Sequence, residues 1–182
     1  MKTLIISALL VFLAFSGKAQ EITQLEEAKV IVPSSVKLST NLSELTFNVE
    51  EDYAGEFTKD PIKFMKENFD IQSVIDQTGE EYDSYVVTFL SSKGHLKADF
   101  DNDGELVRTN QKLKNIMLPL AVRNELYNSH KGWTMVSNKY VASGKSDRID
   151  RAVYRIKLEN GNKTARVKID PMRLEGIAVA NN

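Results

Sequence analysis

Apolar and polar residues alternate in two stretches of the chain, YVVTFLSSKGHLKADFD (85–101) and YRIKLENGNKTARVKID (154–170). An alternation with a period of two is typical of a β-strand that buries one face. A glycine-containing turn, at Gly94 and at Gly161, divides each stretch, so each predicts a β-hairpin. We expect the matching apolar side chains of the two hairpins to be buried, which are Tyr85 and Tyr154, Phe89 and Leu158, and Phe100 and Ile169.

A helical pattern precedes each hairpin. In DPIKFMKENF, Asp60 can cap a helix and Pro61 suits its first position. In LPLAVRNELYNSHKG (118–132), apolar residues recur every fourth position and Gly132 follows the end. Both segments therefore predict a helix with one apolar face.

The chain is expected to contain one unit twice. A strand is predicted after each helix, around Ile71–Ile75 and in residues 132–143, and a longer loop at 143–152 leads to the second hairpin. The predicted fold class is α+β, a tandem repeat of a helix plus an antiparallel hairpin or three-strand unit sharing one antiparallel sheet. Repeat one spans about 59–110 and repeat two about 117–180.

Residues 20–58 form a lead to this tandem domain of residues 59–182. Within the lead, KVIVP (29–33) and ELTFNVE (44–50) predict short strands that add a hairpin or an edge strand.

Residues 1–19 predict a cleaved signal peptide. Lys2 precedes an apolar run from residue 3 to 15, and Gly17 and Ala19 occupy the −3 and −1 positions of a cleavage site. The run is shorter than the about 20 residues of a membrane span. The sequence contains no cysteine, which excludes a lipoprotein anchor, disulfides and thiolate chemistry. The expected location is secreted or periplasmic.

Charge is distributed unevenly along the chain. Residues 21–83 contain 15 acidic and 5 basic residues, whereas residues 84–182 contain 10 acidic and 17 basic residues. The two parts could neutralise each other within one fold, or the basic part could bind a partner. Four cations alternate with the apolar residues of the second hairpin and are the candidate binding residues: Arg155, Lys157, Arg166 and Lys168.

The stretch DFDNDGEL (99–106) offers a candidate metal site. Asp99, Asp101, Asp103 and Gly104 match the first half of a calcium loop, but Asn110 stands where a bidentate glutamate is needed. A turn is favoured, because Asn102, Asp103 and Gly104 are typical turn residues.

These features together resemble the PepSY-like, β-lactamase-inhibitor-like family of secreted bacterial proteins. The resemblance is carried by the signal peptide without cysteine, by the tandem helix–hairpin units, and by DFDNDGEL, LPLAVRNEL and YRIKL…KID over about residues 59–182. It implies a periplasmic or extracellular domain without enzyme activity that binds or inhibits another protein.

Catalytic motifs are absent from the sequence. It has no G-x-S-x-G elbow, no phosphate-binding glycine loop and no histidine pair with the spacing of zinc ligands. We therefore expect a non-enzymatic binding module without a cofactor, whose partner is a protein with an acidic surface and not a nucleic acid. The alternatives are a weak calcium-binding module through residues 99–105 and an uncharacterised hydrolase.

Overall fold

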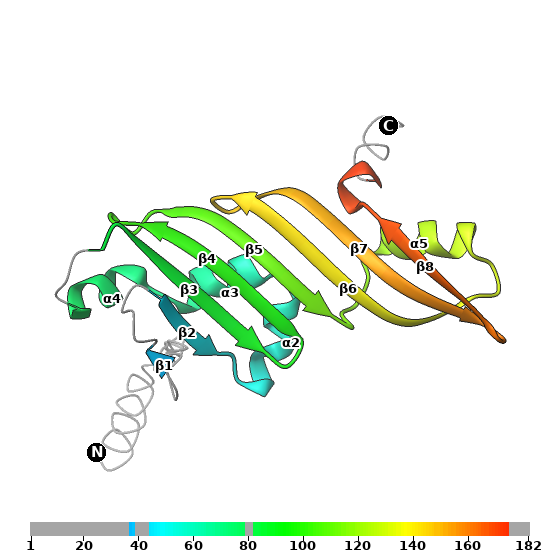
Figure 1. Cartoon of the computed structure of the whole chain (residues 1–182), viewed down its shortest axis with the longest axis horizontal. Helices are drawn as coiled ribbons and strands as arrows, with labels where there is room; N and C mark the ends of the chain where they lie inside the picture. Colours follow the sequence, from blue (N-terminus) through cyan, green and yellow to red (C-terminus); the bar gives the residue numbers. More distant parts are fainter. Residues whose placement is uncertain (1–36, 39–43, 79–81, 175–182) are drawn as a thin grey trace, which may run out of the picture.

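One eight-stranded sheet, with its strands in chain order, forms the body of the protein (Figure 1). The computed structural model describes residues 37–38, 44–78 and 82–174. The strands are β1 (Lys37–Leu38), β2 (Glu44–Asn48), β3 (Ser84–Ser91), β4 (Gly94–Asp101), β5 (Leu106–Lys114), β6 (Thr134–Lys145), β7 (Arg148–Asn160) and β8 (Lys163–Ile169). The helices are η2 (Glu51–Tyr53), α2 (Ala54–Lys59), α3 (Pro61–Asn68), α4 (Ile71–Thr78) and α5 (Leu120–Ser129). The mixed α and β composition is thus confirmed.

The helices lie on one face of the sheet, behind the strands in Figure 1. We call this the inner face and the opposite one the outer face. Strands β3, β4 and β7 alternate buried and more exposed residues along their length, as the period of two predicts. The six side chains expected to be buried are all at most 7% exposed: Tyr85, Phe89, Phe100, Tyr154, Leu158 and Ile169.

Two groups of helices cover two parts of the inner face. Helices α2, α3 and α4 pack over β2–β5, in a core that includes Phe57, Phe64 and Leu96. Helix α5 packs over β7 and β8 through Leu118, which precedes it, and Val122. The partly buried side chains of Ile116 and Tyr140 contact both cores.

The start of α3 and the strand β2 both lie where the sequence predicts them. Asp60 accepts a hydrogen bond from the Lys63 amide at 3.0 Å, and Pro61 is the first helical residue, which confirms the predicted cap. The strand predicted in ELTFNVE is confirmed as β2.

The strand predicted around Ile71–Ile75 is wrong, because this segment is helix α4. Asp70 precedes the helix and accepts hydrogen bonds from the Gln72 amide at 3.0 Å and the Ser73 hydroxyl at 2.6 Å. The hydrogen bond from Ser73, and then the one from Gln72, lower the pKa of Asp70. Ile71 and Ile75 then pack on the larger core at helical spacing.

The long loop predicted at 143–152 is also wrong. Strands β6 and β7 continue through it and leave only Ser146 and Asp147 between them. Ser146 has a φ of 52°, as the left-handed conformation of a tight turn requires. Asp150 supports the turn by accepting from the Lys145 amide at 3.1 Å and pairing with Arg148.

Strands β3 to β8 pair antiparallel throughout, as predicted for residues 59–182, whereas β2 of the lead adds one parallel pair. Strand β2 pairs with β3 in parallel, with Leu45 beside Val87. A parallel pair needs a long crossover, and α2, α3 and α4 provide it. The predicted tandem repeat stays a prediction.

Two predictions at the N-terminus lie outside the described residues. These are the signal peptide at residues 1–19 and the strand at 29–33. Among the helices of the described segments, none has the length and apolar character needed to cross a membrane.

Replacing Gly94 by alanine should destabilise the protein strongly. Gly94 has a φ of 139°, and a Cβ there would lie 2.0 Å from the Lys112 carbonyl oxygen on β5. We expect the free energy of unfolding, measured in urea, to fall by at least about 2 kcal/mol.

Gly55→Ala is the matched control, because a Cβ at this helical position meets nothing within 4 Å. It should raise the free energy of unfolding by up to about 1 kcal/mol. If Gly94→Ala unfolded with the same free energy as the wild type, this would contradict the close approach of β4 to β5 at Gly94.

Candidate functional site

Four basic side chains form one row across the outer face of β5, β6, β7 and β8. Lys114 on β5 lies opposite Lys139 on β6. Arg155 on β7 lies opposite Lys139 on one side and Lys168 of β8 on the other. All four residues are exposed, so the row faces solvent.

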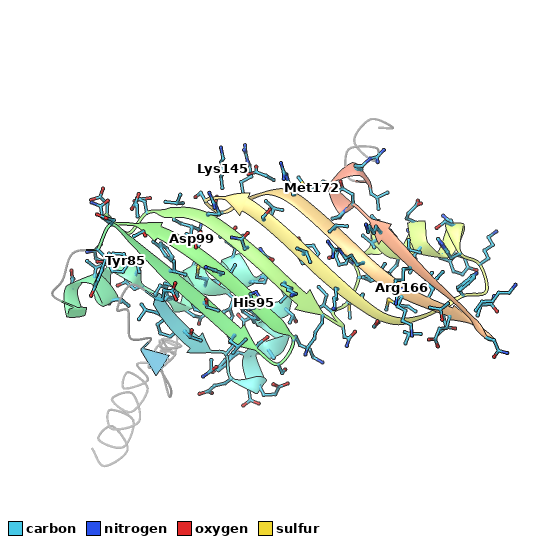
Figure 2. All side chains as sticks on the ribbon, in the orientation of Figure 1. Tyr85, His95, Asp99, Lys145, Arg166 and Met172 are labelled. Atoms are coloured by element: carbon cyan, nitrogen blue, oxygen red, sulfur yellow. The ribbon has the colours of Figure 1, made fainter. Side chains whose placement is uncertain are left out.

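A second, shorter row lies next to the first. Lys157 on β7 is opposite Arg166 on β8 and Ser137 on β6. Side chains of both rows line a groove of about 350 Å³, and Figure 2 labels Arg166 on β8. We call the basic residues of the two rows the cation face: Lys114, Lys139, Arg155, Lys157, Arg166 and Lys168.

The register of the first row is unfavourable for stability. Directly opposed residues in an antiparallel pair have Cα atoms about 4.5–5.5 Å apart. Like charges in such pairs destabilise a sheet, by amounts on the order of 0.2–1 kcal/mol each. Three such contacts follow one another from β5 to β8. The cation face therefore costs the fold stability unless an anion lies over it.

Carboxylates within the described residues leave most of the cation face unpaired. Its one ion pair there joins Lys157 to Glu159 at 2.7 Å, between two partly exposed side chains, and such a pair contributes little. Helices α2, α3 and α4 carry three acidic and three basic residues and pack on the inner face, on the other side of the sheet. None of the ion pairs between described residues joins the cation face to residues 44–83.

A histidine on the outer face responds to its basic surroundings. His95, which Figure 2 labels, is the second residue of β4 and lies opposite Lys112 of β5. Partial burial, and then the positive charge of Lys112, lower the pKa of His95. Lys112 thus adds one positive charge to the outer face next to β4.

The structure brings together all four sequence-predicted binding residues, Arg155, Lys157, Arg166 and Lys168, on one face. Sequence analysis missed Lys114 and Lys139. Their positions in alternating strands could have placed each on an outer face, but the pairing of β5 with β6 was needed to align them.

The stretch DFDNDGEL forms the connection between β4 and β5. Asp101 Oδ1 accepts hydrogen bonds from the amides of Asp103 at 3.1 Å and Glu105 at 2.8 Å. Gly104 has a φ of 81°, as the turn requires. Asp99 lies opposite Arg108, and the described residues contain no group of three side chains suited to hold a metal ion.

Calcium should leave the stability of the protein nearly unchanged. A site with a dissociation constant near 1 mM would add about 1.4 kcal/mol at 10 mM calcium, which shifts the melting temperature by several degrees. Asp101→Asn should be mild, because the amide oxygen can accept the same two bonds, whereas Asp101→Ala should cost about 1 kcal/mol. A calcium-dependent rise in melting temperature that disappears in Asp101→Asn would show that this turn is a metal site.

Comparisons with known proteins give no relative for this chain. No protein-family model, no curated protein and no solved structure matches it. The resemblance to PepSY-like and β-lactamase-inhibitor-like proteins therefore stays a prediction. The function has to be inferred from the chemistry of the chain itself.

Proposed function

We propose that this chain is an exported, non-enzymatic binding module that uses the cation face to hold an acidic surface of another protein. The signal-peptide pattern of residues 1–19 supports a location in the periplasm or outside the cell. Binding or inhibition of an envelope or extracellular protein would agree with the suggested family resemblance.

The observation that carries this proposal is the row of four cations in direct register. On an edge strand such as β8, protection against aggregation is enough to explain charged residues, without any binding role. That explanation does not extend to Lys114, Lys139 and Arg155, because β5, β6 and β7 are interior strands. Positions that reduce stability without serving the fold are typical of binding surfaces.

The positions of the titratable groups with a shifted pKa support a function without enzyme chemistry. Asp70, His95 and Asp147 are described residues with a clearly shifted pKa. Asp70 caps α4, His95 is the second residue of β4, and Asp147 lies in the β6–β7 turn. A hydrolase would instead bring such groups together in one pocket.

We also infer that the two parts of the chain are copies of one α+β unit. A helix followed by three antiparallel strands occurs twice, as α4 with β3–β5 and as α5 with β6–β8. The third strand of the first unit is then β5, in place of the predicted strand at Ile71–Ile75.

Charge reversal should abolish binding of the partner. Residues 20–182 would be immobilised and exposed to periplasmic and secreted proteins of the producing bacterium, at low and at high salt. We expect salt-sensitive capture of an acidic protein, and its loss when four cations are replaced by glutamate, in the variant Arg155→Glu, Lys157→Glu, Arg166→Glu and Lys168→Glu.

The matched control changes the same net charge away from the cation face. It replaces four exposed residues of turns and helices by glutamate: Lys93, Arg123, Lys131 and Arg173. The control should retain the partner. Equal loss in both variants would mean that net charge alone drives capture, and retention in both would exclude the cation face as the binding surface.

A further inference from the structure

A pocket of about 460 Å³ lies on the inner face, between α3 and strands β5, β6 and β7. It occupies the part of the sheet between the two helix groups, where neither α3 nor α5 covers the strands fully. Its strand side includes Gln111, Leu113, Tyr140 and Tyr154, and its helix side includes residues 58–63 and Lys66.

Gln111 differs from the other buried polar residues of the sheet. Thr109, Gln111 and Asn138 are each at most 5% exposed. Asn138 donates to the Ile116 carbonyl at 2.8 Å and accepts from the Ile116 amide at 3.2 Å, and the Thr109 hydroxyl donates to the Ser146 carbonyl at 3.4 Å. The side-chain amide of Gln111 makes no hydrogen bond within the described residues.

The unpaired amide of Gln111 faces the pocket. Of the side-chain oxygens and nitrogens in the described segments, only Oδ1 of Asp99 is both sealed from solvent and without a partner. The Gln111 amide therefore keeps access to open space, and the pocket that it lines provides this space. An amide that opens into a pocket can both donate to and accept from a bound molecule, so a ligand that offers a donor and an acceptor fits it best.

The walls of the pocket are flat and apolar next to this amide. The rings of Tyr140 and Tyr154 lie with their centroids 4.7 Å apart at an angle of 36°. Leu113, Ile116 and Ile149 add aliphatic surface. Such walls fit a planar apolar body.

Two of the three lysines at the rim have a carboxylate partner. Lys66 donates a hydrogen bond to Asp147 across the opening, and Lys63 lies 3.6 Å from Glu67. Asp60 accepts from the Lys63 amide. With Lys59, the rim thus has three lysines and three carboxylates, and this balance favours a neutral ligand.

We propose that this pocket binds a neutral ligand with an amide edge on a flat apolar body, held by a two-way hydrogen bond between that edge and the side-chain amide of Gln111. The amide edge belongs either to a free small molecule or to an uncharged aromatic peptide end. This site lies on the opposite face from the cation face and does not depend on the proposed protein partner.

Benzamide is the simplest probe of this site, and acetophenone is its isostere without the N–H donors. Binding to ¹⁵N-labelled residues 20–182 would be followed by NMR shifts of the Gln111 side-chain amide and the Tyr140 and Ile149 backbone amides. We expect a dissociation constant for benzamide on the order of 1 mM, as for other fragments of this size. Acetophenone should bind about fivefold more weakly, the ratio that one neutral hydrogen bond supplies.

The variant Gln111→Leu should remove the preference for benzamide. Its melting temperature should equal or exceed that of the wild type, because no hydrogen bond of the folded chain is lost. A large drop in the melting temperature of both Gln111→Leu and Gln111→Met would instead assign Gln111 a structural role and overturn the proposal. If the leucine variant does not fold, Gln111→Met and the wild-type ratio of the two probes decide the question.

Two further binding experiments distinguish a small molecule from a peptide end, and the pocket from the cation face. Tight binding of N-acetyl-phenylalaninamide relative to benzamide would identify a peptide end, and the reverse a small molecule. The charge-reversed cation-face variant should bind benzamide as the wild type does. Equal affinity for benzamide and acetophenone, or no shifts at the pocket, would overturn the proposal.

Discussion

Each strand from β3 to β8 has to place one row of side chains against apolar helices and the next row in water. This constraint follows from the period of two in an extended chain, together with helices that lie on one face of the sheet only. It explains why Tyr85 and Leu158 are buried while Arg155 is exposed. It also means that pairing between strands decides which polar side chains meet on the outer face.

The alternation of apolar and polar residues within each strand could be interpreted from the sequence, but the pairing of one strand with another could not. Tyr85, Phe100 and Ile169 were correctly predicted to be buried because each lies in a strand with one apolar face. Ile71–Ile75 was misassigned because a short apolar run fits a strand or a helix, and the Asp70 cap decided between them. The two similar sequence stretches lie 69 residues apart, and matching them pairs β3 with β7 and β4 with β8. The order of elements instead pairs β3, β4 and β5 with β6, β7 and β8. The sequence pattern and the order of elements therefore give different matches between the two units.

The candidate site was predictable in the same partial way. Arg155 and Lys168 could be placed on one face because they belong to one hairpin. Lys114 and Lys139 come from strands separated by α5, so only the three-dimensional pairing brings them into the row. Gln111 gave no signal at all, because a buried glutamine is recognised as unpaired only when its neighbours are known.

The two faces of the sheet thus have different capacities. The outer face concentrates positive charge over β5–β8, and it suits a large acidic surface. The inner face is filled by two cores and leaves one pocket with a polar anchor between them. Occupation of one face does not require the other to be free, since the sheet lies between them.

The central claim is that the cation face reduces the stability of the isolated protein, and the salt dependence of unfolding tests it most directly. The free energy of unfolding would be measured at 10 mM and 1 M salt for the wild type, for Lys139→Gln and for Lys131→Gln, an exposed position outside the face. At low salt Lys139→Gln should be about 0.5–1 kcal/mol more stable than the wild type, because it removes two like-charge contacts. At 1 M salt, where screening acts over about 3 Å, this difference should largely disappear, and Lys131→Gln should match the wild type throughout. A Lys139→Gln variant that is no more stable than the wild type at low salt would contradict the account.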